Sequence, residues 1–381
     1  VQTLCLKYRI FPTKAQERKL ADTLETCRQV YNSLLNDRKF QYELRGKSPS
    51  RYDQQKMFPQ WSKDFPEVKA VHSQVLQNVA VRVDLAHRAF FRRLEAGETP
   101  GFPRRKGDGY GSFCYPQSGF KVGNSTVSLS LFGKQEKVKA KLHRPVTGKV
   151  KTCCIHRAGR KWFACFSVEQ EDAFLPKSED TIGLDAGLNS FLALSNGDFI
   201  DNPCFFRRDE KALAKVGRKQ AKTKKGSKER RKVNKALSRI HERIRNRRHD
   251  FVHQTARRIV NRFGVIAVEK LNVKGMVTPI NPKNHCLAKS ISDASWSMFR
   301  TILTSKAESA GREVIAVNPA YTSQDCSVCG YRPDGFEGRT KKKLGDRWHH
   351  CPMCTASLDR DINAAINILN LATAVGQHSV G

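Results

Sequence analysis

The sequence predicts a multidomain protein of the α/β plus α+β class, and three observations indicate it. Apolar residues recur at helical spacing between residues 13 and 95. Short runs rich in Val, Phe and Tyr, separated by Gly and Pro, follow from 101 to 171 and are typical of a small β-barrel or sandwich. From residue 179 onward strands alternate with helices, which is typical of a mixed sheet. A chain of 381 residues can build roughly two or three such domains.

The first hundred residues predict one strand followed by helices. Residues 2–11 alternate well enough for a strand, and Thr13 with Gln16 has the spacing of a capping box at a helix start. A break near 48–50 precedes a second amphipathic segment at 67–95. The strand could complete the β-barrel with the helices inserted in it. Two independent domains in series fit the spacing nearly as well.

The second half predicts a mixed sheet with one insert. Residues 179–202 predict two or three strands, and further strands follow at 263–269 and 313–317. A cysteine-rich insert spans about 320–358, and a closing helix begins near Asp361. The ends of the strands and the start of this helix can converge at one edge of the sheet.

The charge balance favours a polyanionic partner. Lys and Arg number 69 against 36 Asp and Glu, a formal net charge of +33. Self-repulsion of this size destabilises a compact fold unless a polyanion neutralises it. No apolar run approaches the ~18 residues of a membrane-spanning helix, and the first residues lack the apolar core of a signal peptide. We therefore expect nucleic acid as the partner, no membrane, and a cytoplasmic location.

The basic charge is most concentrated between Lys222 and Arg248, where thirteen Lys or Arg face only Glu229 and Glu242. A charge run is usually a solvated face, but this one is strongly one-sided. It predicts a helix pair that follows a phosphate backbone with salt-sensitive affinity. The candidate contacts are Lys224, Lys225, Arg230, Arg231, Arg243, Arg247 and Arg248.

The twelve cysteines divide into two groups. Eight are scattered and are predicted to be small buried hydrophobic residues, since a disulfide framework is improbable without secretion: Cys5, Cys27, Cys114, Cys153, Cys154, Cys165, Cys204 and Cys286. The other four form two CxxC pairs separated by 21 residues: Cys326, Cys329, Cys351 and Cys354. Two such pairs supply a closed tetrahedron of thiolates, which predicts one structural Zn²⁺. His349 and His350 could compete as ligands, although four sulfurs suffice.

Three acidic residues lie at strand ends or at a helix start, which are positions where a mixed sheet commonly carries catalytic residues. Asp185 ends the first core strand, Glu269 ends the strand at 263–269, and Asp361 opens the last helix. Carboxylate oxygens are suitable ligands for Mg²⁺. Two such ions ~4 Å apart can activate water and stabilise the leaving oxygen of a phosphodiester. Each acid alone fits a helix cap or salt bridge equally well, so the prediction depends on all three together.

Several segments resemble the TnpB family of transposon-encoded proteins. They are GFPRRK (101–106), GLDAGLNSFLALSNG (183–197), VEKLNVKGM (268–276), SISDASW (290–296), PAYTSQDCSVCG (319–330), CPMC (351–354) and DRDINAAINIL (359–369). The resemblance is dense in the C-terminal half, while residues 1–100 match only in pattern.

This resemblance implies four domains. The β-barrel wedge domain would comprise residues 1–12 and 101–176, with a helical recognition domain, 13–100, inserted in it. The RNase H-like (RuvC) nuclease core would comprise 177–319 and 359–381. A zinc-ribbon insert at 320–358 would bind the target nucleic acid.

The resemblance also implies a function: an RNA-guided, Mg²⁺-dependent DNA endonuclease with Asp185, Glu269 and Asp361 as the catalytic acids. A guide RNA from the transposon end would pair with double-stranded target DNA beside a short target-adjacent motif, so the protein would associate with the nucleoid. The alternatives are an RNA-guided repressor that binds DNA without cutting it, and a strand-joining transposase. The three intact acids favour the nuclease.

Four polar residues are candidates for reading the target-adjacent motif: Tyr52, Gln74, Gln77 and Asn78. Gln and Asn can pair with the edge of adenine. Each of the four fits an ordinary polar position on a helix surface equally well.

Overall fold

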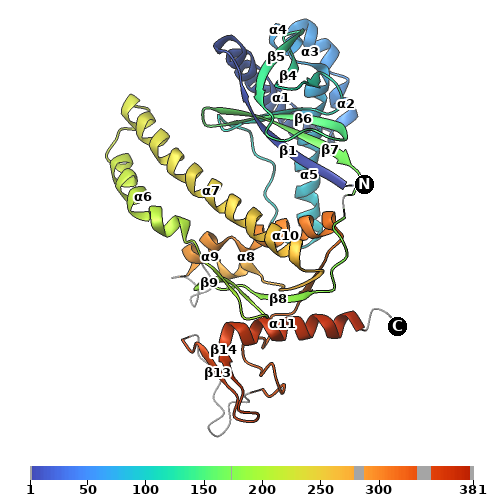
Figure 1. The fold of residues 1–381 in the computed structure, drawn as a ribbon. Coiled ribbons are helices and arrows are strands. Elements are labelled where there is room, and N and C mark those ends of the chain that lie inside the picture. Colours follow the sequence, from blue (N-terminus) through green and yellow to red (C-terminus); the bar gives the residue numbers. More distant parts are fainter. Residues whose placement is uncertain (1, 173, 279–286, 333–344, 378–381) are drawn as a thin grey trace. The chain divides into compact units, whose positions relative to one another are not determined.

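The computed structural model describes residues 2–172, 174–278, 287–332 and 345–377. The chain divides into two compact units, unit 1 at residues 1–171 and unit 2 at residues 172–381. Figure 1 labels most of their helices and strands, numbered in chain order. Within the described ranges, no helix is both long enough and apolar enough to cross a membrane.

Unit 1 is built on a curled sheet of antiparallel strands in the order β2-β6-β7-β1-β5-β4-β3. The strands are β1 (Gln2–Phe11), β2 (Ser112–Tyr115), β3 (Phe120–Val122), β4 (Thr126–Leu131), β5 (Lys134–Lys141), β6 (Lys149–Ala158) and β7 (Lys161–Gln170). The N-terminal strand β1 lies between β7 and β5. The first strand of the chain therefore completes a sheet whose other strands come about a hundred residues later.

Helices occupy the chain between β1 and β2. They are α1 (Lys14–Arg45), α2 (Arg51–Gln55), α3 (Phe58–Asp64), α4 (Pro66–Lys69) and α5 (Ser73–Glu95). The predicted capping box is present at the start of α1: the backbone N–H of Gln16 donates to Thr13 Oγ1, and the Thr13 N–H donates to Gln16 Oε1. α1 ends at Gly46, whose φ of 65° suits a residue without a Cβ.

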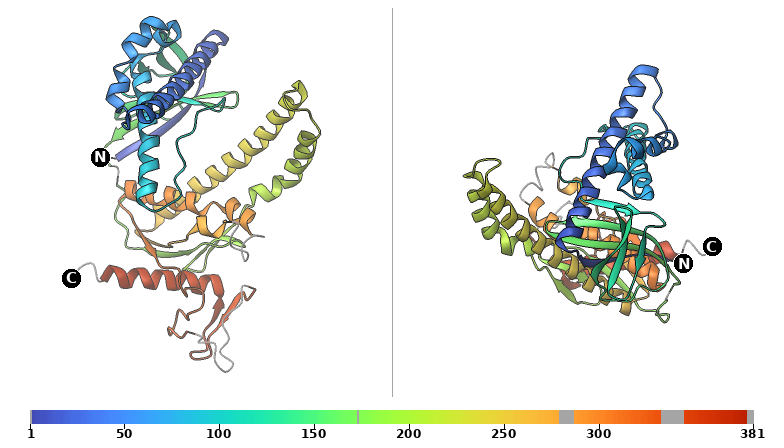
Figure 2. Two further views of the ribbon diagram at one scale, coloured as in Figure 1. Left: turned by 180° about the vertical axis from the view of Figure 1, so that it is seen from behind. Right: turned by 90° about the horizontal axis from the view of Figure 1, so that it is seen from above.

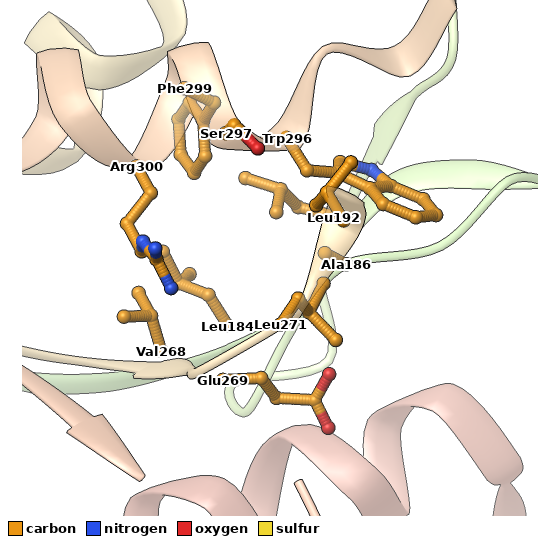
Figure 3. A pocket seen from close by; sticks show the side chains of 11 residues that line it. Leu184, Ala186, Leu192, Val268, Glu269, Leu271, Trp296, Ser297, Phe299 and Arg300 are labelled. Carbon is orange, nitrogen blue, oxygen red and sulfur yellow. The ribbon is translucent and has the colours of Figure 1, made fainter. Parts of the chain in front are cut away.

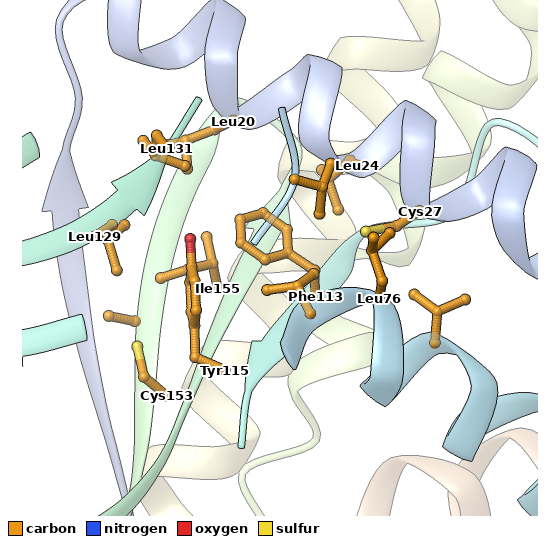
Figure 4. Packing of buried hydrophobic residues seen from close by; sticks show 14 of the residues in the cluster. Leu20, Leu24, Cys27, Leu76, Phe113, Tyr115, Leu129, Leu131, Cys153 and Ile155 are labelled. Carbon is orange, nitrogen blue, oxygen red and sulfur yellow. The ribbon is translucent and has the colours of Figure 1, made fainter. Parts of the chain in front are cut away.

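The core of unit 1 lies between these helices and one face of the sheet. Alternate residues of β7 point inward, and Trp162, Phe166 and Val168 are fully buried. Figure 4 shows Leu20 and Leu24 of α1 near the aromatic side chains of β2, in the same apolar cluster. Burial of each large apolar side chain stabilises the fold by about 1.5–3 kcal/mol.

The cysteines of unit 1 differ in part from the prediction. Cys114 of β2 and Cys154 of β6 stand directly opposite each other and form a disulfide, and Cys5 is exposed. Cys27 and Cys153 are buried as predicted. The strand register brings together two cysteines 40 residues apart, and sequence spacing alone does not give that register. Cys286 lies outside the described residues.

Unit 2 contains a mixed sheet in the order β10-β9-β8-β11-β12. Its strands are β8 (Thr181–Asp185), β9 (Ser190–Leu194), β10 (Phe199–Asp201), β11 (Val265–Glu269) and β12 (Glu313–Val317). β8, β9 and β10 form an antiparallel meander, while β11 pairs in parallel with both β8 and β12. The predicted alternation of strands and helices is therefore present. The central strand of the sheet is β8, which ends in Asp185.

Helices cover both faces of this sheet. They are α6 (Phe205–Ala221), α7 (Lys228–Arg262), α8 (Val273–Met276), α9 (Ala288–Ala294), α10 (Trp296–Ala310) and α11 (Arg360–Gln377). α7 and α10 pack on the face that carries Ile182 and Leu184, and α11 packs on the opposite face. Figure 2 shows α6, in yellow-green, and α7, in yellow, side by side as a long hairpin. The antiparallel pair β13 (Trp348–His350) and β14 (Ser357–Asp359) leads into α11.

Candidate active site

The three acids predicted from the sequence lie on one face of the sheet in unit 2. β8 and β11 are parallel neighbours with Leu184 opposite Val268, so Asp185 and Glu269 follow at the same edge. In both strands the preceding residue points to the face covered by α7 and α10. Because side chains alternate along a strand, Asp185 and Glu269 point to the other face, where α11 lies.

α11 brings the third acid to this face. Asp361 is in the first turn of α11, and the helix packs closely against β8 at Gly183. A Cβ built on Gly183 would lie 2.0 Å from the backbone oxygen of Ala365, a distance that no side chain tolerates. The absence of a side chain at Gly183 therefore allows Asp361 to approach Asp185.

The electrostatics of the three carboxyls show that they are crowded. Burial raises the pKa of Asp185 well above its usual range, and the charges of Glu269 and Asp361 raise it further. Burial also raises the pKa of Glu269 and of Asp361. Desolvated carboxylates that repel one another are unfavourable without a compensating cation. Carboxylate oxygens are the donors that Mg²⁺ prefers, although among the described residues only the four cysteines have ligand atoms close enough together to hold an ion as they stand.

A cavity of about 570 Å³ opens beside these acids, and we call it the acid cavity. Its lining includes Asp185 and Asp361 together with three arginines, Arg207, Arg347 and Arg360. Negative ligands for a cation and positive groups for a phosphate therefore face the same space. A second, much smaller cavity of about 30 Å³ lies behind Glu269. Figure 3 shows the Glu269 carboxylate directed away from the apolar side chains that line it, such as Phe299.

Thr322 contacts one of the acids directly, and sequence reasoning did not identify it. Its hydroxyl donates to Glu269 Oε1 at 2.8 Å, which acts against the effect of burial on the Glu269 pKa. The Thr322 side chain is almost fully buried, with 4% of the residue exposed. Its place in the segment PAYTSQDC, close to the first CxxC pair, was the available signal.

Arg347 contacts a second acid, and sequence reasoning did not identify this contact. Its guanidinium lies 3.8 Å from Asp361 Oδ2. With the side-chain oxygen of Asn189 turned toward it, Asn189 accepts hydrogen bonds from Arg347 at 2.9 and 3.2 Å. Arg347 belongs to the cysteine-rich insert, so this insert contributes a cation to the acid cavity.

The four predicted cysteines form one cluster. Their Sγ atoms all lie within 4.8 Å of one another, and the pairs Cys326–Cys354 and Cys329–Cys351 are each 3.6 Å apart. A tetrahedron with zinc–sulfur bonds of ~2.3 Å has sulfur–sulfur edges of ~3.8 Å. The cluster therefore has the dimensions that could hold a tetrahedral metal ion, and neither His349 nor His350 belongs to it.

The seven basic candidates of the α6–α7 hairpin fall into two groups. Lys224, Lys225 and Arg231 are exposed near its turn. The other four make contacts within unit 2, although Arg243 and Arg247 are also exposed. Arg230 donates to the carbonyls of Gln220 and Thr223, Arg243 and Arg247 pair with Asp209, and Arg248 pairs with Asp293 at 2.6 Å. The charge run therefore combines exposed cations with arginines that hold the hairpin in place.

The four polar candidates of unit 1 lie on α2 and α5. Tyr52 is exposed and its hydroxyl accepts from Arg51 at 2.6 Å, and Gln77 is also exposed. The side-chain oxygen of Gln74 accepts from the N–H groups of Gln117 and Ser118. Asn78 accepts from Arg82 at 2.9 Å. Gln74 and Asn78 thus use their acceptor groups inside the unit.

Family models match three parts of the chain. Residues 165–279 match a model described as "Probable transposase", residues 296–368 match "Cas12f1-like, TNB domain", and residues 3–47 match "Helix-turn-helix domain". In this structure residues 3–47 lie in β1 and in the single long helix α1. Among solved structures, CasPhi-2 bound to crRNA is similar with a TM-score of 0.49 and 10% identity, covering 98% of each chain.

Curated relatives match almost the whole chain. A protein from Streptomyces pristinaespiralis, named "Putative RNA-guided DNA endonuclease", is 31% identical over 95% of this chain and 88% of its own. "Putative RNA-guided DNA endonuclease InsQ" from Escherichia coli strain K12 is 30% identical over 97% of this chain and 92% of its own. With relatives of this identity over almost its whole length, the chain belongs to the TnpB family.

Proposed function

We propose that the protein is an RNA-guided DNA endonuclease of the RuvC type, with Asp185, Glu269 and Asp361 as its catalytic acids. The observation that carries the proposal is the convergence of three acids from three separate segments on one face of the sheet. The names of the relatives that match nearly the whole chain support an RNA-guided DNA endonuclease. An antiparallel meander extended by two parallel strands supports an RNase H-like core.

The chemistry would depend on Mg²⁺. Two Mg²⁺ ions held by the three carboxylates would activate the attacking water and stabilise the leaving oxygen of the phosphodiester. β8, β11 and α11 hold the three ligands, and Thr322 holds Glu269 through its hydroxyl. Arg347 offers a positive charge to a phosphate in the acid cavity.

One structural Zn²⁺ would be bound by the four cysteines. All four ligand positions would be occupied by sulfur, so no position remains for substrate. The insert at 320–358 would then serve as a zinc ribbon that binds target nucleic acid. Residues 333–344, which include much of its basic charge, lie outside the described residues.

The remaining parts would bind the guide RNA and the double-stranded target DNA. We assign residues 1–12 and 101–176 to a wedge domain, 13–100 to a recognition domain, and 177–319 with 359–381 to the RuvC core. The net charge of +33 and the exposed Lys224, Lys225 and Arg231 support contact with a phosphate backbone. Base pairing would read the target, while the protein reads a short target-adjacent motif. The guide would derive from the transposon end, and the protein would act in the cytoplasm on nucleoid DNA.

The test begins with purification of the protein together with its bound RNA. The complex is then incubated with a plasmid library that carries a guide-matched target and a randomised flank, with and without Mg²⁺. We expect guide-dependent cutting that is lost on chelation and in Asp185→Ala, while Asp185→Ala keeps RNA and DNA binding. Sequencing of the cut products gives the target-adjacent motif.

Three other results would decide against the proposal or a part of it. Bound RNA with guide-dependent DNA binding but no cutting by the parent would indicate a repressor. Strand joining without any co-purified RNA would indicate a transposase. Cutting by Asp185→Ala near the parent rate would refute the assignment of the catalytic acids.

A further inference from the structure

Glu269 is held by a residue of the insert that carries the cysteine cluster. The Thr322 hydroxyl donates to Glu269 Oε1 at 2.8 Å. A hydrogen bond to a carboxylate is stronger than one between neutral groups. It also fixes the carboxylate rotamer and leaves the second oxygen for a cation.

The backbone of Thr322 is itself held by α11. Asn367 Nδ2 donates to the carbonyl oxygen of Thr322 at 2.8 Å and to that of Asp325 at 2.9 Å. Asp361, the third acid, lies on the same helix. The backbone position of Thr322 is therefore held by the helix that carries another of the acids.

The same helix also holds the first CxxC pair. Asn363, which is fully buried, donates to the Asp325 carbonyl at 2.7 Å and accepts from the Ser327 N–H at 2.9 Å. Asp325 and Ser327 flank Cys326 in the chain. Hydrogen bonds from α11 thus hold both the backbone on either side of Cys326 and the backbone of Thr322, whose hydroxyl bonds to Glu269.

We propose that Thr322 is a positioning residue that orients Glu269 for cation binding and couples this acid to the cysteine cluster. The inference rests on the proposed function, since it takes Glu269 as a metal ligand. Hydrogen-bond partners of metal ligands typically change metal affinity by about 10–100-fold when they are removed. We expect loss of the Thr322 hydroxyl to weaken cation binding within that range.

The experiment measures Mn²⁺ binding to the full-length, RNA-free protein loaded with zinc. Thr322→Val removes the hydroxyl at nearly constant volume, and Thr322→Ser keeps it. Thr255→Val is a matched control, because Thr255 is also fully buried in unit 2 and its hydroxyl has no hydrogen-bond partner among the described residues. Zinc content and melting temperature are measured on every variant.

We expect Thr322→Val to weaken the Asp185-dependent Mn²⁺ binding by about tenfold or more while it retains its zinc. Thr322→Ser and Thr255→Val should bind Mn²⁺ like the parent. Parent-like affinity in Thr322→Val, or equal weakening in Thr322→Ser, would overturn the inference. If Thr322→Val does not fold, the comparison of Thr322→Ser with Thr322→Ala decides in the same way, because these two differ only in the hydroxyl.

Failure of the proposed function would give a different result. If the parent and Asp185→Ala bind Mn²⁺ equally, the acids are not a cation site, and the inference falls with that assignment. If they differ but Thr322→Val matches the parent, only the role of Thr322 is refuted.

Discussion

Gly183 lies against the backbone of Ala365, and the place of a Cβ on Gly183 is 2.0 Å from the Ala365 oxygen. This contact joins β8, which ends in Asp185, to α11, which begins next to Asp361. The backbone of Leu369 lies 3.0 Å from the same place. A rigid helix backbone cannot yield as a flexible side chain would, so the spacing of the two acids depends on a glycine.

Gly183→Ala is therefore expected to destabilise unit 2 and disturb the acids. Overpacking typically costs about 1–3 kcal/mol of stability. A clash with backbone should cost an amount at or above the upper end of this range. Urea unfolding followed by circular dichroism measures the loss. Gly217→Ala is the control, since a Cβ there meets nothing within 4 Å and Gly→Ala within a helix stabilises by about 0.5–1 kcal/mol. Equal stability of the two variants would refute the close contact.

The crowding of the acids predicts how the Mg²⁺ requirement changes with pH. Burial and the neighbouring charges raise the pKa of Asp185, so it keeps its proton at pH values where an ordinary Asp, with a pKa of about 3.9, is ionised. A proton on Asp185 competes with the cation. The Mg²⁺ concentration for half-maximal cleavage should therefore rise as pH falls, by up to about tenfold per pH unit below the raised pKa.

Cleavage rates across a Mg²⁺ titration at several pH values check this expectation. Saturating Mg²⁺ should restore the rate at the lower pH, which separates competition from unfolding. A Mg²⁺ requirement that does not change with pH would contradict the crowding of the three carboxyls.

Much of this site was predictable because its signals are local. A carboxylate at a strand end and paired cysteines can be recognised from a few residues, which is why Asp185, Glu269 and the four cysteines are candidates from the sequence alone. The contacts of Thr322 and Arg347 with the acids could not be found in this way, because each forms only when the insert folds back onto the sheet. The disulfide of Cys114 with Cys154 depends on strand register for the same reason.

Loss of one cysteine should release the metal from the cluster. In Cys351→Ser the hydroxyl is a poor replacement for a thiolate, so elemental analysis should find zinc falling from one per chain toward zero. If the hydrogen bonds through Asn363 and Asn367 couple the two sites, Mn²⁺ binding by the acids should also weaken. Cys204→Ser is the control, because Cys204 lies outside the cluster. Unchanged zinc in Cys351→Ser would refute the four-sulfur site.

Substitution by alanine at two positions of the basic run should change the stability of the fold by very different amounts. Arg248 pairs at 2.6 Å with Asp293, whose side chain is 4% exposed and which also accepts from the Phe206 N–H at 2.9 Å. Arg248→Ala leaves this buried carboxylate without its cation, a loss of about 3–5 kcal/mol. Lys224 is exposed, so Lys224→Ala should leave stability within about 0.5 kcal/mol of the parent.

Nucleic-acid binding should separate the same two variants. If Lys224 contacts a phosphate, the slope of log affinity against log salt should fall by about 0.7–0.9 in Lys224→Ala. The double variant Arg248→Ala with Asp293→Asn should recover part of the lost stability, because it removes the unpaired charge. Denaturant unfolding and RNA-binding titrations over a range of salt measure both effects. Arg248→Ala could instead keep the parent's stability while its slope of log affinity against log salt falls by the amount of one phosphate contact. Arg248 would then be a nucleic-acid ligand and not a support of the hairpin.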